Sequence, residues 1–230
     1  PTVAPSVMLV LDKSGSMVND PNGYWDHDLD PETPEVTRWN SLFTAVDLTV
    51  HQFDNALNLG VVLFPAITAT ASYDEMACVV AAEPAAPLAA MNAATIVESL
   101  PGPLTDATMM AGGSPATRGL RVAITALADA PAGPRFMILV TDGAANCQED
   151  PPDELARFEA YDENLEPTAA AAAAMGIKTY VVGIAISQTV SDATKDGVPD
   201  STNTYEKLNQ LALAGGVPRP GAEKFFNTTD

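Results

Sequence analysis

Three oxygen-bearing side chains alternate in the segment Asp12-Lys13-Ser14-Gly15-Ser16, directly after the apolar run at residues 7–11. Alternate positions place Asp12, Ser14 and Ser16 on one side of a tight loop, and Gly15 lets the backbone curl. One carboxylate and two hydroxyls make a donor set for a hard cation, Mg²⁺ or Mn²⁺. Because the apolar run reads as a strand buried on both faces, we expect a divalent metal site where that strand ends.

Two further segments carry oxygen donors at the predicted boundary of a strand or a helix. Ser114 follows a Gly-Gly pair and precedes Pro115, which is the pattern of a residue that caps the following helix. Asp142 follows the apolar run at residues 136–140 and precedes a glycine, which is also a common turn pattern.

Taken in this order, the three segments resemble the metal-ion-dependent adhesion site of von Willebrand factor type A domains, also called integrin I-like domains, of the bacterial secreted or surface type. In the family the residue that matches Ser114 is usually Thr and gives its hydroxyl to the metal, so Ser114 would bind the metal, cap the following helix, or do both. The resemblance also implies that Ser114 and Asp142 lie beside Asp12, beyond the carboxyl ends of the strands. The resemblance implies a Mg²⁺ (or Mn²⁺ or Ca²⁺) site held by Asp12, Ser14, Ser16, Ser114 and Asp142, with one position left for an Asp or Glu carboxylate of a protein or polymer ligand. It implies a secreted or cell-surface adhesion module that is not an enzyme.

Two other functions stay open at this stage. Type A domains also serve as intracellular metal-dependent scaffolds of the chelatase or ATPase-associated type. A Mg²⁺-dependent hydrolase is the second alternative, but haloacid-dehalogenase chemistry would need Asp where Ser14 stands. The chain has no Gly-x-x-x-x-Gly-Lys phosphate loop, and neither His27 nor His51 is placed as a general base.

Hydrophobic periodicity predicts alternating strands and helices, the pattern of an α/β fold. We expect a doubly wound, mostly parallel sheet of about six strands flanked by helices, similar to a Rossmann sheet, in a single domain over residues 1–230. The resemblance adds a short antiparallel edge strand, expected near residues 78–80. Residues 18–38 and 144–166 read as loop elaborations. Strands are predicted at 5–12, 59–64, 136–140, 178–185 and 224–227, and helices from 39 onward and at 88–100, 114–129, 167–175 and 204–214.

Charge and hydropathy exclude two classes of partner. The formal net charge is −19, from 30 acidic and 11 basic residues, and such a surface repels nucleic-acid phosphates. No apolar run is long enough to form a membrane-spanning helix, so direct membrane insertion is not expected.

The two cysteines, Cys78 and Cys147, allow one pairing, and each follows a predicted strand. We expect a disulfide between them, which indicates an exported protein; the alternative is two reduced buried cysteines, which would suit the cytosol.

Two loops carry weaker signals. Asp192, Thr194, Asp196 and Asp200, within the loop at 187–203, resemble a Ca²⁺ loop that lacks the bidentate Glu, although an Asp/Gly turn explains the same residues. At the centre of the 18–38 loop, Tyr24 and Trp25 are either ligand contacts or an anchor that packs against the body of the domain.

Overall fold

The computed structural model describes residues 3–18, 25 and 27–228, and a single sheet runs through them. Its six strands follow the order β3-β2-β1-β4-β5-β6, and every neighbouring pair is parallel except β2 with β3. The predicted doubly wound α/β sheet with one antiparallel edge strand is therefore confirmed. The strands are β1 (Ser6–Asp12), β2 (Asn58–Phe64), β3 (Ala86–Ala90), β4 (Arg135–Thr141), β5 (Ile177–Gly183) and β6 (Phe226–Asn227).

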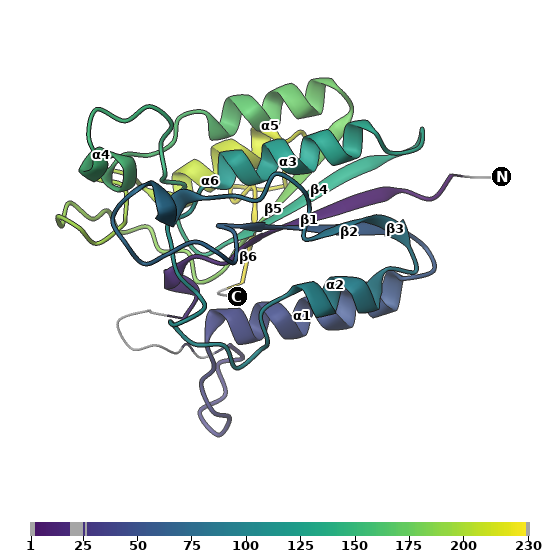
Figure 1. The fold of residues 1–230 in the computed structure, drawn as a ribbon, viewed down its shortest axis with the longest axis horizontal. Coiled ribbons are helices and arrows are strands. Elements are labelled where there is room, and N and C mark those ends of the chain that lie inside the picture. Colours follow the sequence, from purple (N-terminus) through teal and green to yellow (C-terminus); the bar gives the residue numbers. More distant parts are fainter. Residues whose placement is uncertain (1–2, 19–24, 26, 229–230) are drawn as a thin grey trace.

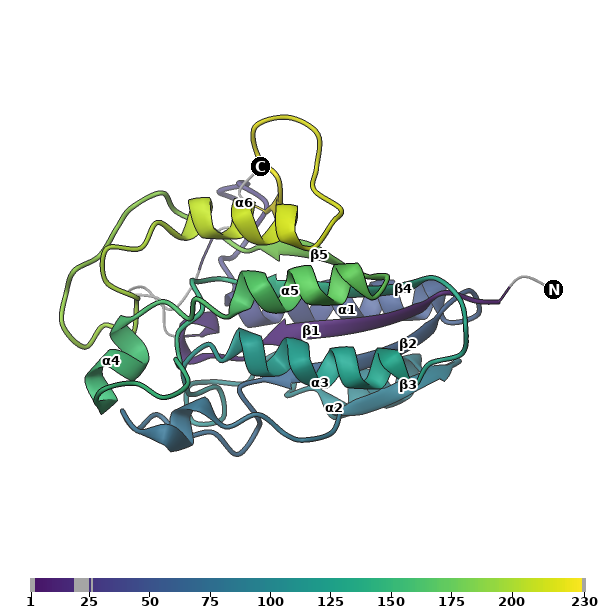
Figure 2. The same ribbon diagram turned by 90° about the horizontal axis from the view of Figure 1, so that it is seen from above.

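Helices cover both faces of the sheet (Figure 1). One layer holds α1 (Arg38–Phe53) and α2 (Ala93–Ser99), and the other holds α3 (Ala116–Ala128), α5 (Leu165–Ala174) and α6 (Thr204–Ala214), as the view from above also shows (Figure 2). The short helix α4 (Glu154–Glu159) and two 3₁₀ turns, Gly15–Met17 and Glu75–Cys78, lie toward the carboxyl ends of the parallel strands, at the left of Figure 1. None of the helices in the described ranges is long and apolar enough to cross a membrane.

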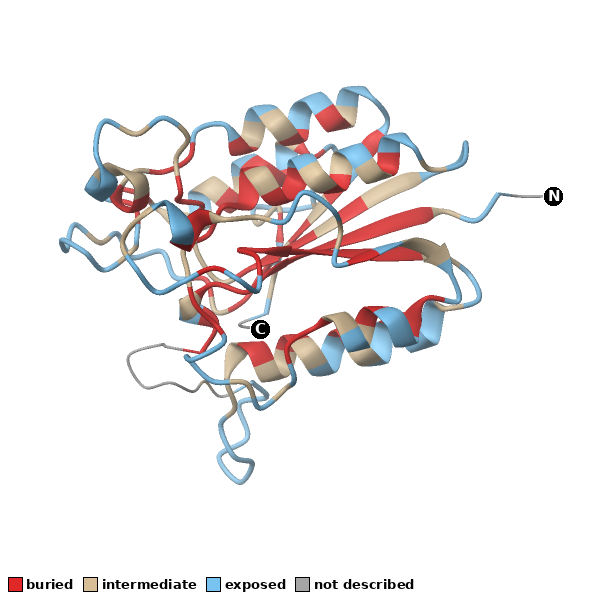
Figure 3. Ribbon diagram, in the orientation of Figure 1, coloured by how far each residue is buried: buried red, intermediate tan, exposed pale blue. Residues whose placement is uncertain are grey.

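Strand β1 lies at the centre of the sheet and is buried along its whole length (Figure 3). It pairs with β2 on one side and β4 on the other. Its side chains alternate between two apolar cores: Leu9 and Leu11 pack with the α1–α2 layer, whereas Met8 and Val10 pack with the α3–α5–α6 layer. The apolar run in the sequence is unbroken because helices cover both faces of this strand.

The edge strand was predicted in the wrong place. It forms at Ala86–Ala90 rather than near residues 78–80, because Cys78 belongs to a 3₁₀ turn that Asp74 caps by accepting a hydrogen bond from the Met76 amide at 2.9 Å. Pro87 lies within β3, a position that an edge strand tolerates. The helix predicted at 88–100 consequently begins only at Ala93.

Two elements of the carboxyl-terminal half also differ from the predicted ones. Helix α5 starts at Leu165, two residues before Pro167, because proline is tolerated in the first turn of a helix. Within the predicted loop at 144–166, Asp153 caps α4 by accepting a hydrogen bond from the Ala156 amide at 2.8 Å. Helix α6 has the predicted bounds.

Candidate metal centre

Two buried carboxylates stand at the carboxyl ends of neighbouring strands. Asp12 is the last residue of β1, and Asp142 directly follows β4, with Leu11 opposite Val140 in the parallel pairing of the two strands. Both side chains are 0 % exposed. The sheet therefore brings together two acidic residues that are far apart in sequence, as the family resemblance implied.

Asp12 is held by hydrogen bonds from three segments. Its Oδ1 accepts from the Ser14 backbone amide at 2.8 Å, and its Oδ2 accepts from the Thr141 hydroxyl at 2.6 Å. The Ser114 hydroxyl reaches the same Oδ2 at 3.5 Å. These bonds fix the orientation of the carboxylate inside the protein.

Hydrogen bonds between side-chain oxygens connect the loop after β1 to Asp142. The Ser14 and Ser16 hydroxyls are 2.9 Å apart, and Ser16 donates to Asp142 Oδ1 at 2.9 Å. The other oxygen of Asp142 accepts from the Arg38 guanidinium, at the start of α1, at 3.2 Å. Asp12, Ser14, Ser16, Ser114 and Asp142 thus come together at one place, as the sequence predicts.

Ser114 does not cap α3, so that part of its interpretation is wrong. Pro115 occupies the N-cap position, and no side chain makes a capping bond. The Ser114 amide instead donates to Asn146 Oδ1 at 2.7 Å, which holds the residue against the segment after β4. A Cβ at Gly113 would lie only 2.6 Å from that Asn146 oxygen and 2.8 Å from Cys147 Sγ, so this position requires glycine.

The predicted disulfide joins Cys78 to Cys147 and packs against the loop that carries Ser114. It links the segment after β2 to the segment after β4. The carbonyl of Ala77, next to Cys78, accepts from the Gly113 amide at 3.0 Å. The covalent link and this hydrogen bond together fix where Ser114 enters the site.

The electrostatics of the site reflect the burial of like charges. Burial, and secondarily the charge of Asp142, raises the pKa of Asp12 to about 7, although hydrogen bonds from Thr141 and Ser14 act against this. Burial also raises the pKa of Asp142, against the lowering effect of Arg38. Lys13 is buried as well, which lowers its pKa to about 8, and its ammonium lies 3.4 Å from the carbonyls of Met109 and Ala111.

This donor set fits a small divalent cation. Two carboxylates that are unfavourable as buried anions would be stabilised by a positive charge between them, and hydroxyl oxygens are suitable hard ligands. In the described ranges no three His, Cys, Asp or Glu residues gather where they could hold a metal, so at this site the serine hydroxyls would have to complete the shell. The residues able to hold the ion are Asp12, Ser14, Ser16, Ser114 and Asp142.

The model of the von Willebrand factor type A domain family matches residues 6–230. The chain belongs to this family. No curated protein matches it by sequence.

Three solved bacterial structures resemble this type A domain in fold. The pilus adhesin SpaC of Lactobacillus rhamnosus GG superposes with a TM-score of 0.60 at 21 % identity, over 94 % of this chain and 28 % of the adhesin. BatB of Bacteroides thetaiotaomicron gives a TM-score of 0.54 at 17 % identity, over 93 % of this chain and 87 % of BatB. The PilB minor pilin of Streptococcus sanguinis gives 0.53 at 16 % identity, over 100 % of this chain and 58 % of the pilin. At such identities the likeness concerns the fold.

The remaining candidate residues of the type A domain lie elsewhere. In the 187–203 loop, Asp192 accepts from the amide and hydroxyl of Ser201, and Asp196 accepts from the Val198 amide and the Ser191 hydroxyl. Their carboxylates form no group with Asp200 that could hold a metal among the residues described. Thr194, in the same loop, is exposed.

The aromatic pair of the 18–38 loop is only partly described. Tyr24 lies outside the described residues. The backbone amide and carbonyl of Trp25 are both hydrogen-bonded to Val36, and the residue packs against the core of the α1–α2 layer. This packing favours the anchor interpretation of Trp25 over a ligand contact.

Sequence reasoning missed three residues that position the ligands of the type A domain. Thr141 holds Asp12, Arg38 holds Asp142, and Asn146 holds Ser114. Thr141 directly precedes Asp142, so a polar side chain ending an apolar strand was a usable signal. For Arg38 and Asn146 no local pattern indicated the role, because their partners are more than 30 residues away in sequence.

Proposed function

We propose that this domain is an adhesion module that binds a carboxylate-bearing protein or polymer through a divalent metal, with Mg²⁺ as the first choice and Mn²⁺ or Ca²⁺ as alternatives. Asp12, Ser14, Ser16, Ser114 and Asp142 would hold the ion. When bound, the ion supplies a Lewis-acid position for one oxygen of the ligand's carboxylate. Thr141, Arg38 and Asn146 keep the surrounding oxygens in place.

One observation carries the proposal. Two fully buried carboxylates, Asp12 and Asp142, meet three hydroxyls at the carboxyl edge of the sheet, and the serines that bear these hydroxyls also line a cavity. Buried acidic groups destabilise a protein unless a partner offsets their charge. Arg38 forms an ion pair with Asp142, whereas none of the ion pairs among the described residues involves Asp12, so a cation beside Asp12 is the partner that this geometry favours.

Secretion or display on a bacterial surface is part of the same proposal. Disulfides persist in oxidising compartments, and Cys78 and Cys147 are bonded. Among the similar structures are a pilus adhesin and a minor pilin, and this chain spans only 28 % and 58 % of them. Mass measurement of native protein without reductant should find no free thiol; two free thiols would favour the intracellular scaffold instead.

A binding role is favoured over hydrolysis by the surroundings of the cavity. Its lining, among the described residues, includes no histidine: His51 is exposed on α1, and His27 lies beside a groove next to α1. Histidine, the side chain that most often serves as a general acid or base, is therefore not among the described residues of this lining. Metal-dependent turnover of a phosphate ester that is lost in Asp12→Asn would contradict this assignment.

Metal-dependent stabilisation tests the proposal directly. Protein stripped with EDTA is melted with and without Mg²⁺, Mn²⁺ or Ca²⁺. An ion present at about 100 times its Kd adds about 2.7 kcal/mol to the free energy of unfolding. For a domain of this size that corresponds to a rise in Tm of about 5–10 °C. Asp12→Ala should abolish the rise, and it should also abolish metal-dependent binding of carboxylates.

Asp47→Ala is the matched control, since Asp47 is a half-exposed aspartate on α1, away from the cavity. It should keep the full response to metal. If none of the three ions changes the Tm of the wild-type protein, or if Asp12→Ala responds as the wild type does, the proposed metal site is wrong.

A further inference from the structure

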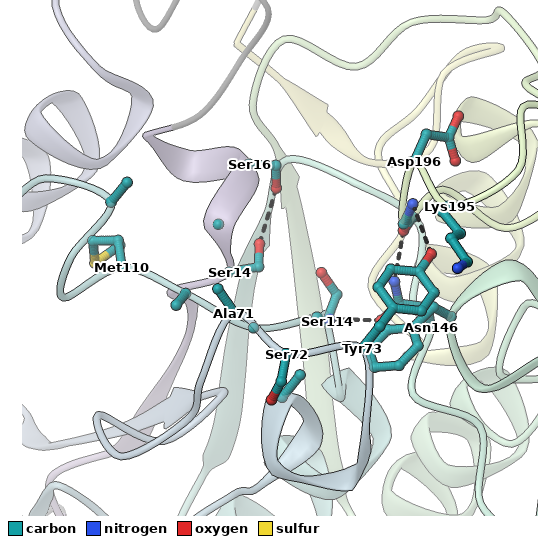
Figure 4. Close-up of a pocket in the computed structure, with 18 residues that line it drawn as sticks. Ser14, Ser16, Ala71, Ser72, Tyr73, Met110, Ser114, Asn146, Lys195 and Asp196 are labelled. Atoms are coloured by element: carbon teal, nitrogen blue, oxygen red, sulfur yellow. Dashed lines mark hydrogen bonds between the residues drawn. The ribbon is translucent and has the colours of Figure 1, made fainter. Parts of the chain in front are cut away.

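A cavity of about 300 Å³ opens beside the three serines of the proposed metal site. In Figure 4, Ser14, Ser16 and Ser114 stand on one side of it, and Tyr73, Asn146 and Lys195 stand on the other. A ligand whose carboxylate reaches the metal would therefore extend toward Lys195. The properties of this second wall indicate what the rest of the ligand contains.

The second wall is fixed by hydrogen bonds to both sides of one glycine. Asn146 Nδ2 donates to the Gly197 carbonyl at 2.7 Å, and the Gly197 amide donates to the Tyr73 hydroxyl at 3.2 Å. The Tyr73 ring stacks on Phe158 with their centroids 4.2 Å apart. These contacts set the place of Lys195, two residues before Gly197. Asn146 also binds the Ser114 amide, so one buried side chain connects the two walls.

Lys195 offers an uncompensated positive charge on this wall. Its side chain is exposed, and no carboxylate in the described ranges forms an ion pair with it. The neighbouring Asp196 accepts hydrogen bonds from Ser191 and Val198 of its own loop. Figure 4 shows the Asp196 carboxylate directed away from the three serines. In a chain of net charge −19, an unpaired ammonium on the cavity wall favours an anionic group.

Most other polar groups of the cavity already have partners inside the protein. The Tyr73 hydroxyl binds Glu159 and Gly197, the Ser72 hydroxyl binds Asp74, and the Asn146 side chain is used at both ends. The rest of the lining is largely alanine, glycine, Met110 and Phe158. Such a surface suits the methylene groups of an acidic side chain better than the many hydroxyls of a sugar.

We propose that the cavity recognises a second acidic group, so that the ligand is a protein segment with two nearby Asp or Glu side chains. One carboxylate goes to the metal and the other pairs with the Lys195 ammonium, while methylene groups between them pack along the stacked rings of Tyr73 and Phe158. This inference rests on the proposed metal-dependent function and narrows the ligand that it binds.

The test uses the full chain loaded with Mn²⁺, and it follows the displacement of metal-bound water by proton relaxation. The probes are the dicarboxylates from succinate to suberate, the monomethyl ester of each, and 6-aminohexanoate. Because a dicarboxylate carries two equivalent carboxylates and its half-ester only one, affinities are compared per carboxylate. On that basis we expect at least one dicarboxylate to bind about two- to fivefold more tightly than its own half-ester, the gain of a partly screened ion pair. Lys195→Gln should remove this advantage and leave the affinities for Mn²⁺ and for the half-ester unchanged, and Lys195→Arg should restore it.

Lys178→Gln is the matched control. It removes the same charge from an exposed position near the start of β5, at the end of the strand away from the cavity. This variant should still bind the dicarboxylate more tightly than the half-ester. Equal binding of dicarboxylate and half-ester, persistence of the advantage in Lys195→Gln, or tighter binding of 6-aminohexanoate would overturn this inference alone. Failure of every carboxylate to bind in the presence of Mn²⁺ would overturn the proposed function, and this inference with it. A galacturonate dimer that outbinds every dicarboxylate would point to a polysaccharide instead.

Discussion

Two acidic loops follow parallel strands of the same sheet, and they use their carboxylates in opposite ways. After β1, Asp12 is buried, lies within the electrostatic influence of Asp142, and meets the hydroxyls of Ser114 and Thr141, which come from other segments. After β5, Asp192 and Asp196 are exposed and accept hydrogen bonds from their own loop. The spacing of oxygen donors along one loop therefore does not define a cation site. What distinguishes the β1 loop is that carboxylates from separate strands converge inside the protein.

The tightest part of the first site should be the most sensitive to added bulk. In Gly113→Ala the new methyl group would meet Asn146 and Cys147 and displace the Ser114 loop. We expect a loss of about 1–3 kcal/mol in the free energy of unfolding, the usual cost of overpacking, together with weaker metal binding. Urea unfolding and a Mn²⁺ titration measure the two effects.

Gly143→Ala is the comparison variant, because a Cβ at Gly143, next to Asp142, would have no atom within 4 Å. It should be close to neutral in both measurements. If Gly113→Ala binds Mn²⁺ as tightly as Gly143→Ala, the position of Ser114 does not matter to the site.

Removing one charge from each acidic loop tests the contrast itself. Burial raises the pKa of Asp12 from 3.8 to about 7, so its charge destabilises the metal-free protein. Asp12→Asn should therefore raise the metal-free stability by at least about 1 kcal/mol, since one pKa unit corresponds to about 1.4 kcal/mol. It should also eliminate the rise in Tm with Mg²⁺.

Asp192→Asn keeps a side-chain oxygen for the Ser201 amide, so we expect almost no change in metal-free stability or in the response to Mg²⁺. Thermal melts of both variants with EDTA and with Mg²⁺ decide the matter. Should Asp192→Asn lose the response while Asp12→Asn keeps it, the two loops have been assigned the wrong way round.

The smallest effect is expected at an ion pair near the first site. Glu149 accepts two hydrogen bonds from Arg121, on α3, which hold the pKa of the Glu149 carboxyl below its ordinary value of 4.5. Its contribution is therefore present above pH 4.5 and is lost as the pH falls through the lowered value. Glu149→Gln should cost less than about 1 kcal/mol at pH 7, because the pair is partly exposed.

The difference in stability between wild type and Glu149→Gln should shrink steadily below pH 4.5. It should also shrink in high salt, which screens exposed charges. Urea unfolding of both proteins over this pH range provides the measurement. A difference that grows toward acid pH would mean that Glu149 does not act through Arg121.

The sequence allowed the fold and the five candidate ligands to be predicted because each has a local signal. Apolar runs identify β1, β2, β4 and β5, and polar residues at their ends identify Asp12 and Asp142. What failed depends on contacts between distant segments. Cys78 lies in a turn and not in the edge strand that was predicted there. The Asn146 side chain, 32 residues from Ser114 in sequence, accepts a hydrogen bond from the Ser114 amide, at a position that the sequence predicted to be a helix cap. Periodicity carries no information on such pairings.

The position of β1 has a consequence for the thermodynamics of ligand capture. All seven of its residues are buried, and both of its edges are hydrogen-bonded to neighbouring strands. Asp12 therefore ends a segment that has little conformational freedom. Most of the conformational entropy of this carboxylate is lost when the polypeptide folds. Little of it would remain to be lost on binding of an ion. A preorganised donor of this kind allows tight association without a large structural rearrangement.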